Sequence, residues 1–294
     1  MKDYIKLIRV KHWIKNILIL LPIFFSRNFV NAEKIIGILI GFISFSLVAS
    51  SIYIINDISD MEKDKKHPVK KDRPIASGKI SVKNASILAT LLVIIAFVFL
   101  IVGCICFNAN LIGGIFYLTL YFLLNLVYSM GLKDKSIVDI AILAFGFVIR
   151  VLFGGAIIKV NISSWLFLTI FAIAFYLGLG KRRNEYIKHQ DKETREVLKF
   201  YNIEFLNKNM YMCLSLAVCF YALWAKDYEN PIILWSVPLI MLMCMKYSLN
   251  VEQNDSEGDP TDIIIRDKWL IILGIIYFLL MLFGIYGTAT SYSL

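Results

Sequence analysis

Three aspartates in segment 56–78 have the spacing of a metal site. Asp57, Asp60 and Asp64 stand at offsets of 0, 3 and 7, which places them on one face of a helix two turns long. Carboxylates grouped in this way favour Mg²⁺, a hard ion that proteins commonly share with substrate phosphates. The sequence therefore predicts a Mg²⁺ site with these three carboxylates as metal ligands and catalytic residues, and the preceding Asn56 beside the substrate.

Basic residues follow the aspartates within the same segment. Lys70 and Arg73 come shortly before Ser77-Gly78. Because lysine and arginine form charge-assisted hydrogen bonds with phosphate oxygens, we expect both to bind the phosphates that share the metal. A hydrophilic loop with mixed charges between two membrane helices is the simpler alternative, and the specific order of the residues disfavours it.

The elements that carry these residues are those of a membrane protein. The chain of 294 residues is 59% hydrophobic with a mean hydropathy of +0.70. Its apolar runs reach membrane-spanning length. Nine spans are expected, near residues 14–29, 35–55, 85–107, 111–130, 137–158, 165–180, 210–225, 232–249 and 269–286. The sequence predicts an all-α, polytopic membrane protein with one integral domain over residues 1–294.

Basic residues are distributed unevenly between the two ends of these spans. Of the 31 Lys and Arg residues, 26 lie in the N-terminal segment and in alternate connections, whereas the opposite connections hold four. By the positive-inside rule the N-terminus is cytoplasmic and the C-terminus lies outside a cell membrane. The net charge of +9 is then concentrated on one face, where it attracts anionic lipid headgroups or substrates, and no nucleic-acid partner is expected.

Two long cytoplasmic connections, 56–84 and 181–209, are expected to cap the bundle and to carry function. Both exceed the length of a simple connector, and loops on a rigid scaffold commonly carry chemistry. In 181–209, apolar residues among bases and acids also suit an amphipathic helix that anchors the chain at the membrane surface. That alternative stays open for this segment.

Polar residues within or beside the spans are further candidates, because a charge in the bilayer costs at least about 2.5 kcal/mol. Arg150 lies near the middle of the fifth span, either as a substrate ligand or as a structural residue that satisfies backbone carbonyls. Asp139 lies on the same helical face, where it could join the metal site or orient a sugar hydroxyl.

Two further pairs of residues mark the predicted membrane boundary. Tyr128 and Lys133 follow the fourth span, where they could donate hydrogen bonds to a diphosphate or serve as interfacial anchors. The basic stretch 9–16, which includes Lys15 and Asn16, lies where the first span enters the membrane. This position suits a lipid-borne phosphate, and a charged anchor explains it nearly as well.

The order N-D-x-x-D-x-x-x-D, H-P and R-P-I-x-S-G over residues 56–78 resembles the first aspartate-rich motif of the UbiA superfamily of intramembrane prenyltransferases. The resemblance implies nine transmembrane helices around a cavity that faces the cytoplasm. It also favours the substrate role of Tyr128 and Lys133, because Y-x-x-x-L-K is a feature of UbiA-like sequences at this point.

The sixth-to-seventh connection departs from the superfamily pattern. UbiA-like enzymes normally carry a second aspartate-rich motif there, whereas this chain reads G-K-R-R-N-E-Y over residues 180–186. The departure is similar to the branch of decaprenyl-phosphate phosphoribosyltransferases. Further motifs similar to that branch are R-V-K-H-W-I-K-N (9–16), Y-S-M-G-L-K (128–133), I-R-V-L-F-G-G-A (149–156) and E-G-D-P-T-D-I-I-I-R-D (257–267).

The branch resemblance implies Mg²⁺-dependent transfer of 5-phosphoribosyl from phosphoribosyl diphosphate (PRPP) to a polyprenyl phosphate, with release of diphosphate and inversion at the anomeric carbon. Lys181, Arg182 and Arg183 replace the second metal motif, so we expect them to hold a phosphate without a metal. The alternatives are prenyl transfer from a prenyl diphosphate to an aromatic or other acceptor, a lipid or small-molecule transporter, and a non-catalytic scaffold.

Overall fold

The computed structural model describes residues 2–66, 70–188, 196–252 and 267–287. The described residues form helices and connections without any strand, so the predicted all-α class is confirmed. The chain divides into two compact units, which are described separately: residues 1–142 with 149–161, and residues 143–148 with 162–294. The prediction of one integral domain stays a prediction.

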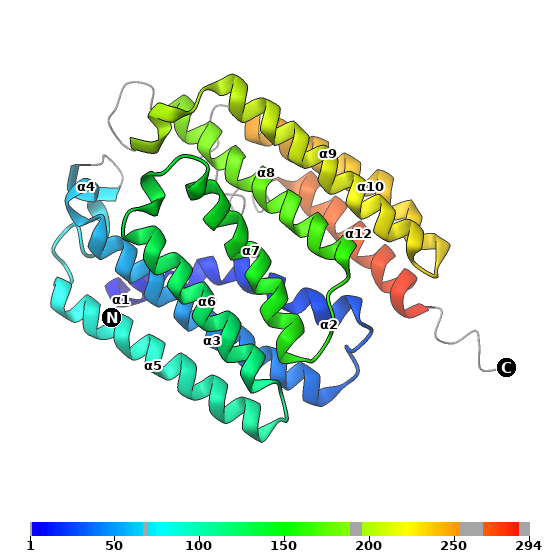
Figure 1. Cartoon of the computed structure of the whole chain (residues 1–294), viewed down its shortest axis with the longest axis horizontal. Helices are drawn as coiled ribbons and strands as arrows, with labels where there is room; N and C mark the ends of the chain where they lie inside the picture. The colour runs from blue at the N-terminus through cyan, green and yellow to red at the C-terminus, as the bar shows by residue number, and fades with distance from the viewer. Residues whose placement is uncertain (1, 67–69, 189–195, 253–266, 288–294) are drawn as a thin grey trace. The chain divides into compact units, whose positions relative to one another are not determined.

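The first unit is built around one long helix, α3 (Ala32–Ser59), which packs against α5, α6 and the N-terminal segments (Figure 1). The other elements are α1 (Lys2–Ile8), η1 (Val10–Leu20), α2 (Leu21–Phe25), α4 (Met61–Lys66), η2 (Lys70–Asp72), α5 (Val82–Cys106), α6 (Leu111–Ser129), η3 (Leu132–Asp134) and most of α7 (Val138–Ile157). Asn31 caps the start of α3 by accepting a hydrogen bond from the N–H of Lys34. Because α3 is apolar around most of its circumference, it can be buried on several sides at once.

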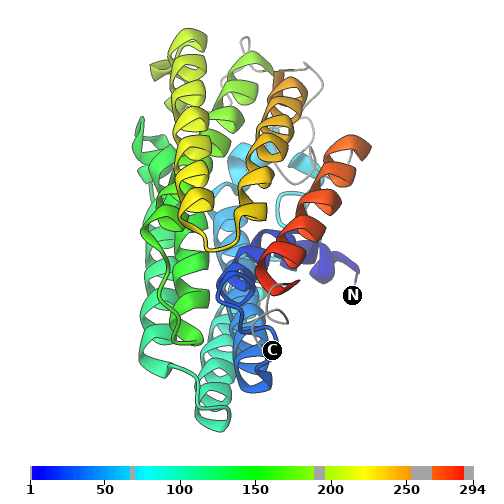
Figure 2. The same ribbon diagram turned by 90° about the vertical axis from the view of Figure 1, so that its right-hand side faces the viewer.

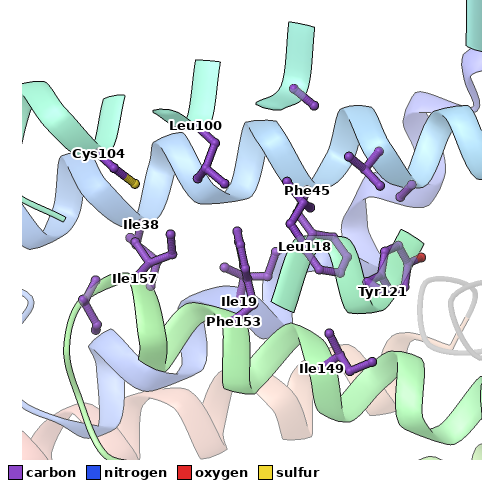
Figure 3. Packing of buried hydrophobic residues seen from close by; sticks show 14 of the residues in the cluster. Ile19, Ile38, Phe45, Leu100, Cys104, Leu118, Tyr121, Ile149, Phe153 and Ile157 are labelled. Atoms are coloured by element: carbon purple, nitrogen blue, oxygen red, sulfur yellow. The ribbon is translucent and has the colours of Figure 1, made fainter. Parts of the chain in front are cut away.

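Aromatic rings form the centre of the first unit (Figure 3). The ring of Phe45 lies 4.3 Å from that of Tyr121 and 5.2 Å from that of Phe153, and Ile19 and Leu118 fill the space around them. Lipid tails are as apolar as these side chains, so close packing rather than transfer from water holds the helices together.

Helix α7 crosses the 3-10 helix η1 at Gly154. A Cβ atom at this position would lie 2.1 Å from the carbonyl oxygen of Ile19, closer than atoms can approach. Glycine is therefore required here because the two backbones touch.

The second unit contains α8 (Ser164–Lys188) along α9 (Ile203–Asp227), and α10 (Ser236–Glu252) beside α12 (Lys268–Tyr286). Figure 2 shows α10 in orange and α12 in red. Two short 3-10 helices, η4 (Glu196–Phe200) and η5 (Pro231–Trp235), complete the unit. Packing of α8 on α9 is the most extensive in it, since both helices are 25 residues long and run side by side.

Asp267 caps the start of α12 and joins it to α10. Its carboxylate accepts hydrogen bonds from the N–H groups of Trp269 and Leu270, from Asn250 Nδ2 at 2.7 Å, and pairs with Lys246 Nζ at 3.0 Å. Desolvation alone would raise the pKa of Asp267, but these hydrogen bonds outweigh it and lower the pKa to about 2. The cap is therefore ionised throughout the neutral range.

Seven helical segments in the described part of the chain are long and apolar enough to cross a membrane. They are α3, α5, α6, α7, α8, the continuous segment of η5 and α10, and α12. The protein is thus a multi-pass membrane protein, and the predicted number of nine spans is not confirmed. The predicted span 14–29 is not one helix, because η1 gives way at residue 21 to the short α2, which has Pro22 in its first turn.

Gly154→Ala is expected to lower the melting temperature in detergent, because the added methyl group forces η1 and α7 apart at a cost of about 1–3 kcal/mol. Gly274→Ala in α12 is the matched control, since a Cβ atom there meets nothing within 4 Å. The control should be neutral or stabilising by up to about 1 kcal/mol. Equal melting temperatures for the two variants would contradict the close contact.

Candidate active site

The three aspartates span the junction between α3 and α4. Helix α3 ends at Ser59, and Asp60 takes the capping position with φ −95° and ψ 5°. The N–H of Asp60 donates to the carbonyl oxygen of Asn56 at 2.9 Å, and the N–H of Asp64 donates to that of Asp60 at 2.8 Å. The helical path therefore continues past Asp60 with a slight break rather than as the single regular helix that the spacing predicts.

Arg73 bridges two of the three carboxylates. Its Nη1 lies 2.7 Å from Asp64 Oδ2 and 3.0 Å from Asp57 Oδ1. The two carboxylates are nearly inaccessible to solvent, at 2% for Asp57 and 4% for Asp64. One cation thus draws the first and third aspartates together, in agreement with their spacing of two helical turns.

The turn that follows Arg73 explains why the sequence R-P-I-x-S-G is needed. Ile75 is buried in a core cluster with Leu7 and Ile54, which fixes the segment against α1 and α3. Ser77 Oγ donates to the carbonyl oxygen of Arg73 at 2.8 Å, and Gly78 has φ +74°, a conformation that favours glycine. The turn therefore holds Arg73 beside Asp57 and Asp64.

Arg9 contacts Asp57, a contact that the sequence did not predict. Its Nη2 lies 2.6 Å from Asp57 Oδ1, and its guanidinium lies 5.1 Å from the centroid of the Tyr53 ring. The backbone at Arg9 is left-handed, with φ 55° and ψ 48°, where α1 gives way to η1. Arg9 is the first residue of the motif R-V-K-H-W-I-K-N. The motif indicates that bases lie near the membrane boundary, but it does not show which of them reaches the carboxylates.

Asp60 pairs with a different base. Its Oδ1 forms an ion pair with Lys133 Nζ, in the short helix η3 after α6. Nearby, Ser59 Oγ donates to the carbonyl oxygen of Ser129 at 3.2 Å, and Ser129 Oγ donates to Asn56 Oδ1 at 3.4 Å. The ends of α3 and α6 are thereby joined, which places Asn56 and Lys133 beside the aspartates, and their roles toward a substrate stay predictions.

Two other predicted phosphate ligands lie on the elements that surround this site. Lys70 begins η2 and is exposed to solvent, whereas Tyr128 is half-buried in the last turn of α6. Both belong to the first unit, and their roles toward a substrate stay predictions.

Arg150 and Asn16 contact each other inside the first unit. Arg150 Nε donates to Asn16 Oδ1 at 2.7 Å, and Arg150 Nη2 donates to the Tyr121 hydroxyl at 2.9 Å. The guanidinium also lies 5.2 Å from the centroid of the Phe45 ring. Asn16 Nδ2 in turn donates to Ser46 Oγ on α3 at 2.9 Å. These contacts with side chains show Arg150 in a structural role inside the unit, and its alternative role as a substrate ligand stays a prediction.

Asp139 and Lys15 complete the predicted residues of the first unit. Asp139 is completely buried in the first turn of α7, and its N–H donates to the carbonyl oxygen of Lys135 at 3.1 Å. Lys15 is half-buried in η1, next to Asn16.

Lys181, Arg182 and Arg183 lie in the last two turns of α8 and not in a loop, which corrects the predicted connection 181–209. Arg182 is completely buried, and its Nη1 lies 2.6 Å from Glu185 Oε2. Arg183 Nε donates to Asn207 Oδ1 on α9 at 2.7 Å. The helix can extend beyond the apolar run because polar groups of α8 and α9 satisfy these charges. Residues 189–195 of the predicted connection lie outside the described residues.

The donor set at the α3–α4 junction suits a hard divalent cation. Two buried carboxylates converge on one cation, and carboxylate oxygens are the ligands that Mg²⁺ prefers. Among the described residues, however, no three carboxylate, imidazole or thiolate groups come close enough together to hold a metal ion. Asp57, Asp60 and Asp64 as joint metal ligands therefore stay a prediction.

Comparison with known proteins identifies the family of this chain. The sequence profile of the UbiA prenyltransferase family matches residues 18–265, most of the chain. The chain belongs to the UbiA prenyltransferase family. The resemblance of the motif at 56–78 is thereby confirmed, and the protein is a transferase of this family.

Two relatives of this UbiA-family protein are decaprenyl-phosphate phosphoribosyltransferases. The protein from Corynebacterium glutamicum is 29% identical over 292 residues, which cover 96% of this chain and 86% of the relative. The protein from Mycobacterium tuberculosis is 29% identical over 282 residues, covering 92% and 90%. Among solved structures, a UbiA homolog from Archaeoglobus fulgidus bound to GPP and Mg²⁺ is 18% identical with a TM-score of 0.71, covering 96% of this chain and 98% of its own. That likeness shows the fold.

Asp57→Asn and Asp64→Asn are each expected to weaken Mg²⁺ binding by more than about tenfold, since both carboxylates converge on one cation position. Isothermal titration calorimetry on the purified protein measures this. Glu62→Gln is the matched control, because Glu62 is an exposed acid of α4 that pairs with Lys65. Asp60→Asn tests the third ligand. A loss equal to that of the other two variants would mean that Asp60 leaves Lys133 for the metal.

Proposed function

We propose that this protein transfers the 5-phosphoribosyl group of PRPP to a polyprenyl phosphate and releases diphosphate. The observation that carries the proposal is the similarity to decaprenyl-phosphate phosphoribosyltransferases over nine-tenths of the chain. The relatives' names include a lipid phosphate, which supports a lipid substrate for this membrane protein. The same proposal places the N-terminus and the site in the cytoplasm, because the donor is soluble in water.

Prenyl transfer from a prenyl diphosphate is the second candidate. Homologs of the same fold are known with GPP or DMAPP and Mg²⁺, but they are 18% and 19% identical to this chain. The sequence Lys181-Arg182-Arg183 disfavours this candidate, because a second acidic motif is missing from the end of α8. A single acidic motif is chemically sufficient when the soluble donor carries the diphosphate and the lipid carries only a monophosphate.

In the proposed reaction the bond between the anomeric carbon of ribose and the diphosphate oxygen breaks. A phosphate oxygen of the lipid forms the new bond from the opposite face, so the anomeric configuration inverts. The phosphate dianion is already deprotonated and needs no general base. This agrees with a site of carboxylates and cations.

In this proposal, two groups of residues of the first unit bind the donor. Asp57 and Asp64, with Asp60 in reach of the same junction, would hold Mg²⁺, which when bound neutralises charge on the departing diphosphate. Arg73 and Lys133 are paired with these carboxylates and supply further positive charge for the diphosphate. Loss of either base should therefore weaken use of PRPP more than use of the lipid.

Incubation of the purified protein with Mg²⁺, radiolabelled PRPP and a polyprenyl phosphate, followed by lipid extraction, tests the reaction. Label should enter the lipid phase, and Arg73→Ala and Lys133→Ala should raise the KM for PRPP at least about tenfold because each removes a charge-assisted hydrogen bond. No label in the lipid, together with turnover of a prenyl diphosphate, would favour the second candidate. A raised KM for the lipid alone would reverse the assignment of donor and acceptor sites.

Arg183→Ala is expected to lower transfer at least about tenfold, and added Mg²⁺ should not restore it, because guanidinium binds a phosphate directly. Lys208→Ala is the matched control. Lys208 is an exposed base of α9 that pairs with Glu204. If Arg183 served only to anchor the chain at the membrane surface, both variants would keep full activity in detergent.

A further inference from the structure

The cluster of two buried carboxylates and two arginines has no net charge without a metal. Asp57 and Asp64 contribute two negative charges, and Arg9 and Arg73 contribute two positive charges within 3.0 Å. Buried carboxylates need such partners, since an unpaired charge away from water is strongly unfavourable. The two guanidiniums thus supply the same total charge as the divalent cation that the carboxylates are suited to hold.

Both guanidiniums occupy oxygens that a metal would use. Asp57 Oδ1 accepts from Arg9 at 2.6 Å and from Arg73 at 3.0 Å, and Asp64 Oδ2 accepts from Arg73 at 2.7 Å. A cation that binds these oxygens has to displace the arginines. Displacement leaves two partly buried positive charges in need of anions, and the oxygens of a diphosphate supply them.

We propose that Mg²⁺ enters this site in exchange for Arg9 and Arg73, and that the released guanidiniums become ligands of the diphosphate. The exchange keeps the site close to neutral in both states, because the metal and the diphosphate arrive together. Arg9 is then a substrate-binding residue, although its motif lies 48 residues before Asp57. The proposal rests on the proposed function only in the assignment of Asp57 and Asp64 as metal ligands.

The surroundings of Arg9 and Arg73 permit this movement. Their side chains retain 19% and 26% of their solvent exposure, whereas Asp57 is 2% exposed. Arg9 lies at the junction of α1 and η1, and Arg73 lies on the turn after η2, so neither is in the interior of a regular helix. Asp57 and Asp64 lie on the helices α3 and α4, so the exchange moves the arginine side chains and not the carboxylates.

Exchange predicts how metal and diphosphate depend on each other. Mg²⁺ alone has to compete with two guanidiniums and should bind wild-type protein weakly, whereas Mg²⁺ with inorganic diphosphate should bind together and tightly. Arg9→Gln removes one competitor. It should lower the melting temperature of the metal-free protein and tighten binding of Mg²⁺ alone about tenfold. The same variant should lose much of the added stabilisation that diphosphate gives.

Calorimetry and thermal unfolding of the full chain in detergent, with Mg²⁺, inorganic diphosphate or both, measure these effects without PRPP or lipid. Lys71→Gln is the matched control, since Lys71 is an exposed base beside the site, and it should match wild type. Arg9→Lys keeps the charge and should retain weak binding of Mg²⁺ alone.

Unchanged or weaker binding of Mg²⁺ alone by Arg9→Gln would overturn the exchange. If Arg9→Gln does not fold, Arg73→Gln provides the same comparison with the same expected tightening. Because the probe is inorganic diphosphate, failure of phosphoribosyl transfer in the lipid assay leaves this test intact, and the two failures are distinguishable.

Discussion

Pairing of buried carboxylates with guanidiniums is the interaction on which the polar end of the first unit depends. Asp57 and Asp64 are almost inaccessible to water, and their charges are compatible with that burial because Arg9 and Arg73 lie within 3.0 Å. Each partner comes from a different part of the chain, so the ion pairs bring together the N-terminal segment, the end of α3, α4 and the turn after η2. The ion pairs of the candidate site are therefore also the contacts that hold this end of the unit together.

A second polar group holds the N-terminal segment deeper in the unit. Trp13 Nε1 donates to Ser50 Oγ at 3.0 Å, and Asn16 links Ser46 on α3 to Arg150 on α7. Polar groups within a bilayer have to be satisfied by the protein itself, and this network satisfies them. The segment η1 is thus attached at Arg9 just before it begins and at Trp13 and Asn16 within it, and these contacts help to retain a 3-10 helix of unusual length.

In the second unit two neighbouring arginines have partners of different charge. Arg182 pairs with Glu185 one turn later on α8, and Arg183 donates to the neutral amide of Asn207 on α9. A guanidinium that faces an amide keeps its net charge, whereas one that faces a carboxylate does not. Arg183 is thus better suited than Arg182 to attract an anion, and the fully buried Arg182 is better suited to joining the turns of α8.

The sequence by itself determined the class of the protein, because apolar runs of membrane-spanning length and clustered carboxylates are local properties of the chain. It also placed Asp57 and Asp64 on a common face, because seven residues make two helical turns, and their role as metal ligands stays a prediction. Only the tertiary structure decided which bases meet them. Arg9 reaches Asp57 across 48 residues, and Asn16 meets Arg150 across 134. It also decided that α8 continues through Lys181, Arg182 and Arg183, since the partners that satisfy these charges include Asn207 on α9, which no local pattern shows.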